Sequence, residues 1–254
     1  MVNLRAIQVA ADLALVRPVF HVAGAAYWRA KRQTLELIAR NVRPADRTVE
    51  TGCGASTVVF AATGALHTAI SPSRDEYMRV LAYCAEHAID ASGVTFVEGY
   101  SDQVLPSLGD DQDLDFAFID GAHAFPYPIL DWSYLARRVR LGGFLTLDDV
   151  PIPTIAVAYR FMRADEAWEL VEIADDQAAS FRRVAHDLLG DYWRIQRFNR
   201  SYPDFSFLPV SRRVPLTIRQ RLANAKRWVR SGGRMQPIAG IEKARGPRKP
   251  PQRD

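Results

Sequence analysis

The feature that most constrains the fold is the decapeptide TVETGCGAST at residues 48–57. In it, the glycines Gly52 and Gly54 follow the acidic Glu50, and an apolar run at 58–62 comes directly afterwards. This order predicts a buried strand, a tight glycine turn and a helix whose first amide groups face a ligand. Gly52 can adopt positive φ, Gly54 allows close approach to the backbone, and Glu50 is placed to accept hydrogen bonds from the ligand.

Strand and helix patterns alternate through the next hundred residues. Short apolar strands are predicted at 67–70, 94–97, 114–119 and 144–147, in alternation with helices. Ser73 and Glu76 form a capping box that opens a helix through residue 91, and a further helix is expected at 130–139. Five such alternations predict an α/β, Rossmann-like, doubly wound and mostly parallel sheet.

Charge and composition divide the chain into three parts. Residues 1–44 are predicted to be a helical segment, with an amphipathic helix at 26–42, and residues 45–210 the main domain. Residues 211–254 carry 13 Lys and Arg against 2 acids, whereas the first 210 residues have a net charge of −7. Few apolar residues remain after 232, so this basic tail is expected to be largely disordered.

The cysteine content and the N-terminal sequence indicate the compartment. Two cysteines, Cys53 and Cys84, are too few for a disulfide framework and suit a reducing environment. Asp12 and Arg17 interrupt the apolar N-terminal stretch, which therefore does not resemble a signal peptide or a membrane span. We expect a cytoplasmic protein with no membrane partner, and the sequence leaves a homo-oligomer open.

The glycine turn differs from the dinucleotide-binding fingerprint at two positions. The third glycine of that fingerprint is replaced by Thr57, and the acid expected after the second strand is replaced by Ser71. The acid-x-Gly-x-Gly form instead resembles the first motif of class I S-adenosylmethionine (SAM) methyltransferases, with Ser56 at that family's third glycine. This resemblance implies SAM as the cofactor, and a closing antiparallel hairpin, here at 168–173 and 179–184, that completes a seven-stranded sheet.

The cofactor site implied by the resemblance is spread over the ends of the first four strands. Ser71 takes the place of the usual ribose-binding acid, and the two residues after the third strand are expected to flank the adenine. The full set of candidates is Glu50, Gly52, Cys53, Gly54, Ser56, Thr57, Ser71, Tyr100, Ser101 and Asp120.

Acidic residues follow the fourth and fifth strands. Asp120 lies at the tip of the fourth strand in the segment FIDGAHAF and is followed three residues later by His123. Asp148 and Asp149 follow the fifth strand in the segment LTLDDV. Because neighbouring parallel strands end at the same edge, three carboxylates are predicted to converge, which is costly unless a cation compensates. Oxygen ligands in this number suit Mg²⁺.

These two segments resemble the IDG-x-H and LDD motifs of bacterial small-molecule and sugar O-methyltransferases, and their order matches the metal-dependent catechol-type enzymes. The resemblance covers residues 45–185 and implies that Asp120, Asp148 and Asp149 bind a metal ion. His123 stands where the catechol-type enzymes have a basic lysine, so the resemblance makes it the catalytic base, with Asp120 beside it. The implied activity is methyl transfer from SAM to a hydroxyl of a small molecule.

Other interpretations remain open. The two consecutive aspartates also fit a strand-end turn, His123 a structural histidine, and Tyr127, Asp131 and Trp132 either an acceptor pocket or helix packing. The basic tail alone suggests a protein that binds or modifies nucleic acid, although it lacks aromatic residues other than Trp228. A non-catalytic SAM-binding module and a dinucleotide-dependent reductase are weaker alternatives. The acceptor is not identified by any motif.

Overall fold

The computed structural model of this 254-residue chain describes residues 3–21, 31–109, 114–185, 196, 198–199 and 205–230. The chain divides into two units, Met1–Leu188 and Leu189–Asp254, each of which is described by itself. The first unit contains the glycine turn and all the predicted site residues.

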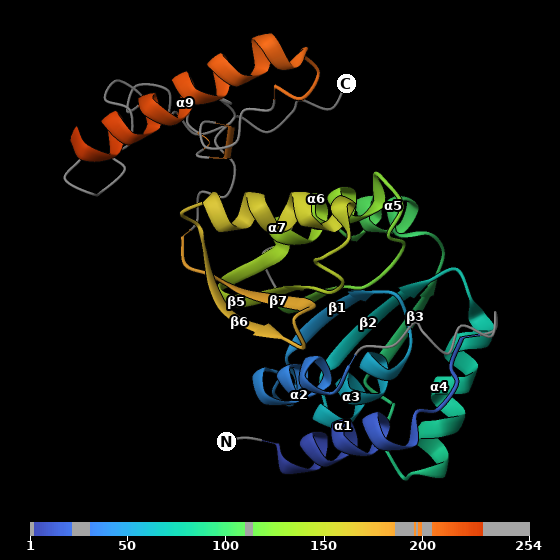
Figure 1. The fold of residues 1–254 in the computed structure, drawn as a ribbon. Helices are drawn as coiled ribbons and strands as arrows, with labels where there is room; N and C mark the ends of the chain where they lie inside the picture. Colours follow the sequence, from blue (N-terminus) through green and yellow to red (C-terminus); the bar gives the residue numbers. More distant parts are fainter. Residues whose placement is uncertain are drawn as a thin grey trace, which may run out of the picture. The chain divides into compact units, whose positions relative to one another are not determined.

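A seven-stranded sheet with the order β3-β2-β1-β4-β5-β7-β6 forms the centre of the first unit (Figure 1). The first five strands are parallel, whereas β7 pairs antiparallel with both β5 and β6. This arrangement confirms the predicted fold class. The strands are β1 Arg47–Thr51, β2 Leu66–Ser71, β3 Val94–Glu98, β4 Leu114–Ile119, β5 Val139–Leu147, β6 Trp168–Ala174 and β7 Ala178–Arg183.

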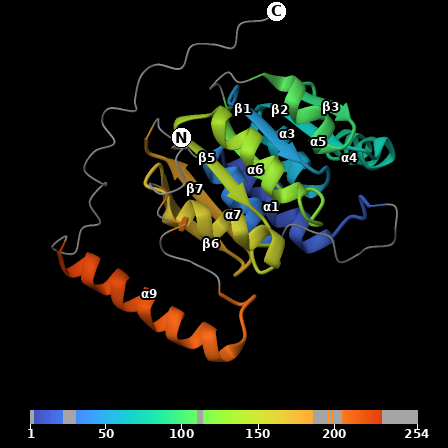
Figure 2. The same ribbon diagram turned by 90° about the horizontal axis from the view of Figure 1, so that it is seen from above.

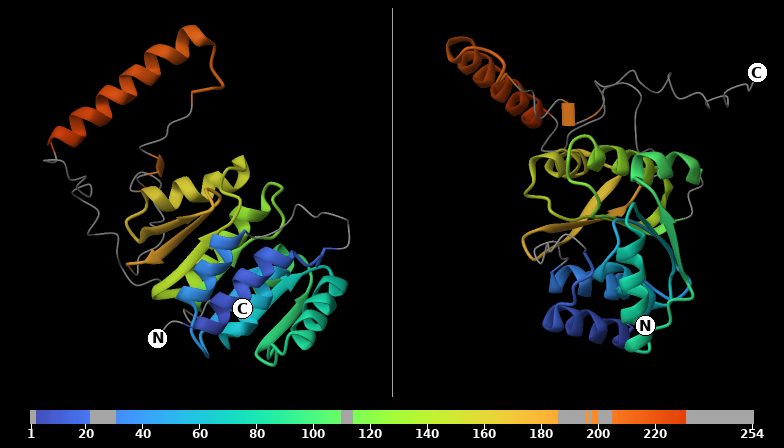
Figure 3. Two further views of the ribbon diagram at one scale, coloured as in Figure 1. Left: turned by 60° about the horizontal axis from the view of Figure 1, so that its bottom comes forward. Right: turned by 90° about the vertical axis from the view of Figure 1, so that its right-hand side faces the viewer.

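Helices cover both faces of the sheet (Figures 1 and 2). On one face, α1 (Leu4–Val16), α2 (Arg32–Asn41) and α3 (Ala55–Thr63) pack on one another, and α4 (Arg74–Glu86) packs beside α3. The other face carries α5 (Ser101–Val104), the 3₁₀ turn Leu105–Leu108, α6 (Tyr127–Arg138) and α7 (Pro153–Ala164). Two views in Figure 3 show the sheet between these layers.

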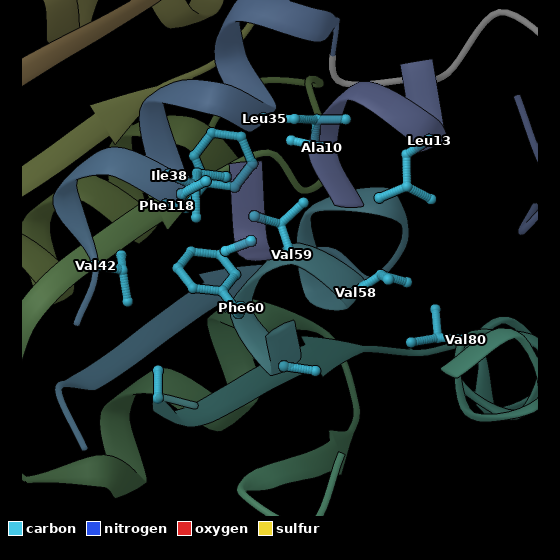
Figure 4. Close-up of a cluster of buried hydrophobic side chains, with 14 of the residues drawn as sticks. Ala10, Leu13, Leu35, Ile38, Val42, Val58, Val59, Phe60, Val80 and Phe118 are labelled. Carbon is cyan, nitrogen blue, oxygen red and sulfur yellow. The ribbon is translucent and has the colours of Figure 1, made fainter. Parts of the chain in front are cut away.

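A cluster of buried apolar side chains lies under the N-terminal helices. Ala10 and Leu13 from α1 meet Leu35 and Ile38 from α2 above the α3 residues Val58–Phe60 (Figure 4). All of these side chains are at most 3% exposed. The two N-terminal helices therefore share the core of the sheet domain.

Element boundaries follow the sequence pattern closely, with two corrections. The helix predicted through residue 91 ends at Glu86, and β5 begins at Val139, five residues before the predicted start. Gly142 and Gly143 lie inside β5 and do not precede it; a side chain on Gly143 would approach three backbone carbonyls at 3.0 Å. The predicted helix at 26–42 falls partly outside the described residues.

The described part of the second unit is dominated by one helix, α9 (Val210–Arg230). Residues 211–254 were expected to be largely disordered, and α9 corrects that expectation for its first half; residues 231–254 lie outside the described part. Among the described helices, none combines the length and the apolar character needed to cross a membrane.

Candidate functional site

The glycine turn follows β1 as predicted, but its first glycine is needed for a contact within the protein. Gly52 has φ of 108° and donates its amide to the Ile70 carbonyl at 2.8 Å. A Cβ on Gly52 would lie 2.6 Å from the Asp120 carbonyl oxygen at the end of β4. A substitution here therefore disturbs the junction of two strands, in addition to any effect on a ligand.

Glu50 is 1% exposed, and its carboxylate is held entirely by protein groups. Ser56 donates to it at 2.6 Å, Thr57 donates to its other oxygen, and His67 Nε2 lies 3.1 Å away. The imidazole of His67 also contacts the Thr48 hydroxyl at 2.8 Å. The predicted cofactor candidates Glu50, Ser56 and Thr57 thus form a buried polar network beneath the turn.

This network fixes the turn itself. The Gly54 amide donates to the Thr57 hydroxyl at 2.9 Å, so the chain from Glu50 through Thr57 ends on the backbone of the second glycine. Cys53, between the two glycines, is 5% exposed, and burial raises its pKa to about 12. Its thiol is neutral at physiological pH.

The segment that contains Phe20 and His21 lies against Gly54, the second glycine of the turn. Sequence reasoning missed this contact. A Cβ on Gly54 would lie 3.4 Å from His21 Nε2, and His21 Nδ1 lies 3.0 Å from the Glu76 carboxylate on α4. Arg79 donates to the Phe20 carbonyl at 2.9 Å and holds the same segment. Glu76 was predicted as a capping-box residue, and its pairing with His21 has no signal in the local sequence.

The ends of β2 and β3 contribute three predicted cofactor residues with different accessibility. Ser71 is 4% exposed, and its hydroxyl accepts a hydrogen bond from the Ser73 amide at 3.2 Å. Tyr100 is 52% exposed, whereas Ser101 is buried at the start of α5. Of the three, only the Tyr100 side chain is open to a ligand.

A second polar group forms where β4 and β5 end. Asp120, His123 and Asp149 each offer one atom, and these atoms lie within 4.8 Å of one another. His123 Nε2 is 3.8 Å from Asp120 and 3.5 Å from Asp149. Thr154, in the first turn of α7, donates to the His123 carbonyl at 2.6 Å and fixes its loop.

Asp148, which was predicted as the third carboxylate of a metal site, lies outside this group. It is 2% exposed, and its pKa is raised well above the usual value by burial and by the charge of Asp120. The group combines two of the predicted carboxylates with His123. The two aspartates differ because Asp148 stays buried at the strand end, whereas the backbone of Asp149 adopts positive φ (50°) after the strand.

The electrostatics of the group favour an added positive charge. Burial raises the pKa of Asp120, and His123 partly offsets that rise. The neighbouring Asp120 and Asp149 raise the pKa of His123. Nε2 of His123 and Oδ1 of Asp148 are buried without a hydrogen-bond partner among the described residues. Two carboxylates, an imidazole and an unsatisfied buried oxygen fit a divalent cation.

Asp131 on α6 is a further buried acid beneath the same edge. Its side chain is completely buried, and neither oxygen has a hydrogen bond of standard geometry to a described residue. Burial raises its pKa to about 6, and the nearby hydroxyls of Ser101 and Thr51 oppose that rise. A Cβ on Gly121 would lie 3.5 Å from Asp131 Oδ2. Asp131 therefore lies behind the loops that follow β1, β3 and β4 and does not line an acceptor pocket.

Comparison with known proteins agrees with this arrangement. Residues 49–150, which run from the glycine turn to the paired aspartates, match the family described as "Methyltransferase domain". Residues 49–150 are therefore similar to a methyltransferase domain. No protein of curated function matches the sequence.

Solved structures of methyltransferases share the fold of the chain at low identity. A methyltransferase from Podospora anserina bound to S-adenosylhomocysteine is 16% identical with a TM-score of 0.52, covering 71% of this chain and 88% of that one. A putative O-methyltransferase from Klebsiella pneumoniae is 19% identical (TM-score 0.51; 72% and 90% covered). The O-methyltransferase TomG from Streptomyces achromogenes, in complex with SAM, is 17% identical (TM-score 0.50; 71% and 90% covered).

Proposed function

We propose that this protein transfers the methyl group of SAM to a hydroxyl oxygen of a small molecule. The observation that carries the proposal is that one edge of the sheet brings together the glycine turn after β1 and the group of Asp120, His123 and Asp149 after β4 and β5. The similarity in fold to O-methyltransferases, one of them bound to SAM, supports the same activity.

In this proposal SAM lies along the turn, against the backbone of Gly52 and Gly54, with its adenine beside Tyr100. Glu50, Ser56 and Thr57 keep the turn in shape and do not touch the cofactor, because their polar atoms already bind one another. His21 borders the position of Gly54 and makes the N-terminal segment part of the cofactor site. The sulfonium methyl then faces the end of β4, where an in-line approach of the acceptor oxygen is possible.

Asp120 and Asp149 would hold a divalent cation at that point, with Asp148 close behind. When bound, such an ion supplies Lewis acidity that favours loss of the acceptor's hydroxyl proton. The two carboxylates also orient the acceptor through that site, and their partial exposure of 24% and 28% leaves room for it.

His123 accepts the hydroxyl proton at Nε2 in this proposal. The nearby carboxylates of Asp120 and Asp149 stabilise the imidazolium that forms, which agrees with their effect on the His123 pKa. Since the raised pKa keeps part of the histidine protonated at neutral pH, the rate is expected to increase with pH through the His123 titration.

Calorimetry tests the cofactor first: SAM and S-adenosylhomocysteine should bind, and NADPH should not. Methyl transfer is then measured with labelled SAM on hydroxylated acceptors, including catechols and sugars. His123→Ala should lower turnover roughly 10²–10⁴-fold. His87→Ala is the matched control, because His87 lies at the end of α4. NADPH binding without SAM binding would refute the proposal.

A titration with Mn²⁺, followed by electron paramagnetic resonance, separates the two possible roles of His123. If His123 is the base, His123→Ala retains Mn²⁺ affinity and loses turnover. If affinity falls about tenfold or more, His123 is a metal ligand and the base lies elsewhere. Full activity after exhaustive chelation would show that the reaction needs no metal ion. The proposed role of His123 as the base would be unaffected.

A further inference from the structure

Helix α9 combines a strong positive charge with an apolar stripe. Its 21 residues contain seven Lys or Arg and no Asp or Glu. The apolar residues Val214, Ile218, Leu222 and Val229 recur at intervals of four, four and seven, which places them along one side of an α-helix. The helix is therefore both basic and amphipathic.

The apolar stripe is exposed. Val214, Ile218, Leu222 and Val229 are 49%, 54%, 58% and 69% exposed. Residues on the opposite side of the helix, including Leu216, Gln220 and Ala223, are less exposed. The side of α9 that most needs a partner is thus the side that the described chain leaves open.

Cations border the stripe on both sides. At 100° per residue, Arg221 falls along one margin of the stripe, and Arg219 and Lys226 fall along the other. All three are exposed. Long basic side chains at the margins of an apolar stripe can extend their charges to anionic groups while their carbon stems follow the apolar surface.

We propose that α9 binds the surface of an anionic lipid bilayer, lying in the interface with its apolar stripe inserted between headgroups. The charge of the helix complements acidic phospholipids, and the stripe supplies the apolar area that surface binding requires. A nucleic acid would use the cations but would leave the four apolar side chains exposed to water. This inference is independent of the proposed enzymatic function, and it replaces the expectation of no membrane partner.

The sequence that follows the helix has the same charge. Residues 231–254 contain six Lys or Arg and two acids. A polybasic stretch next to an interfacial helix adds electrostatic attraction to anionic lipid, and this part of the affinity is screened by salt.

The test is sedimentation of the full-length protein with phosphatidylcholine vesicles that contain or lack phosphatidylglycerol. Binding is expected only to the anionic vesicles. Ile218→Glu should weaken it roughly 50-fold, because it removes an apolar anchor and adds a negative charge. Gln220→Glu adds the same charge on the opposite side and should cost about fivefold at most.

Leu222→Gln provides a second variant that changes no charge and is expected to weaken binding about tenfold. Unchanged thermal unfolding of the methyltransferase domain confirms that each variant is folded. The proposal is overturned if anionic vesicles are not bound, or if the apolar variants bind as well as Gln220→Glu. Tighter binding to RNA or DNA than to vesicles, with no effect of Leu222→Gln, would assign the helix to nucleic acid.

Discussion

The strands β1, β4 and β5 end at one edge of the sheet, but the buried polar groups at their ends differ in hydrogen bonding. At the end of β1, the Glu50 carboxylate has three protein partners and is 1% exposed. At the other two ends, Asp120 and Asp149 lie 3.8 and 3.5 Å from His123, and one buried oxygen of Asp148 has no hydrogen-bond partner in the part of the chain that the structure describes.

The difference bears on the proposed function, because the two kinds of carboxylate respond differently to a ligand. A buried carboxylate that is fully hydrogen-bonded stabilises its surroundings and gains nothing from a ligand. Burial and neighbouring acids raise the pKa of Asp120 and Asp148, and such carboxylates are stabilised in the charged form when a cation binds. We therefore propose that the Glu50 network maintains the structure of the site, the frame. We propose that Asp120, His123 and Asp149 take part in the reaction.

The largest effect is expected where the two regions touch, at Gly52. Gly52→Ala places a Cβ 2.6 Å from the Asp120 carbonyl at a positive φ, and should lower the free energy of unfolding by roughly 3–5 kcal/mol. Gly109→Ala is the matched control, because Gly109 also has positive φ (78°), but a Cβ there would meet no atom within 4 Å among the described residues beyond its chain neighbours. It should cost only about 1 kcal/mol. Equal losses in denaturant titrations would mean that the Asp120 contact is unimportant.

Isosteric neutralisation of one acid in each region sharpens the comparison. Glu50→Gln should cost about 2–3 kcal/mol of unfolding free energy, because it weakens three buried hydrogen bonds. Asp149→Asn should change stability by less than about 1 kcal/mol without metal, because Asp149 is partly exposed and loses only its attraction to His123. If Asp149→Asn is the more destabilising of the two, the assignment of frame and reaction is reversed.

A smaller, pH-dependent effect is expected at Asp131, which lies behind both regions. The pKa of about 6, against an ordinary value of 3.8, means that the folded state keeps its proton where the unfolded state loses it. Stability therefore falls as pH rises from about 4 to 6 and stays lower above that range. Asp131→Asn should raise the unfolding free energy by about 1–2 kcal/mol at pH 8 and leave it unchanged at pH 4. A uniform effect at both pH values would contradict the raised pKa.

Much of the fold around the site can be predicted from the sequence. The buried run Leu114–Ile119 is predicted residue for residue, because a central strand with both faces covered is almost entirely apolar. The proximity of Asp120 and Asp149 follows from the same pattern, since parallel neighbours end at one edge.

The sequence does not predict which side chains contact one another. Nothing local indicates that His67 on β2 reaches Glu50, because that contact depends on the register between strands. His21 contacts Glu76, which is 55 residues away in the sequence. The sequence around Asp131 does not distinguish it from an exposed acid on a helix, and only the structure shows that it is buried. Asp148 and Asp149 are adjacent in sequence, and only the backbone φ at Asp149 separates them.

The most direct test of the central assignment is an Mn²⁺ titration of the folded protein, comparing wild type with Asp149→Asn and Glu50→Gln under the same conditions. We predict one bound ion per chain, an affinity at least about tenfold weaker in Asp149→Asn, and wild-type affinity in Glu50→Gln wherever that variant remains folded. Equal affinity in wild type and Asp149→Asn, or no bound ion in wild type, would contradict the assignment of the β4 and β5 ends as the metal and reaction site.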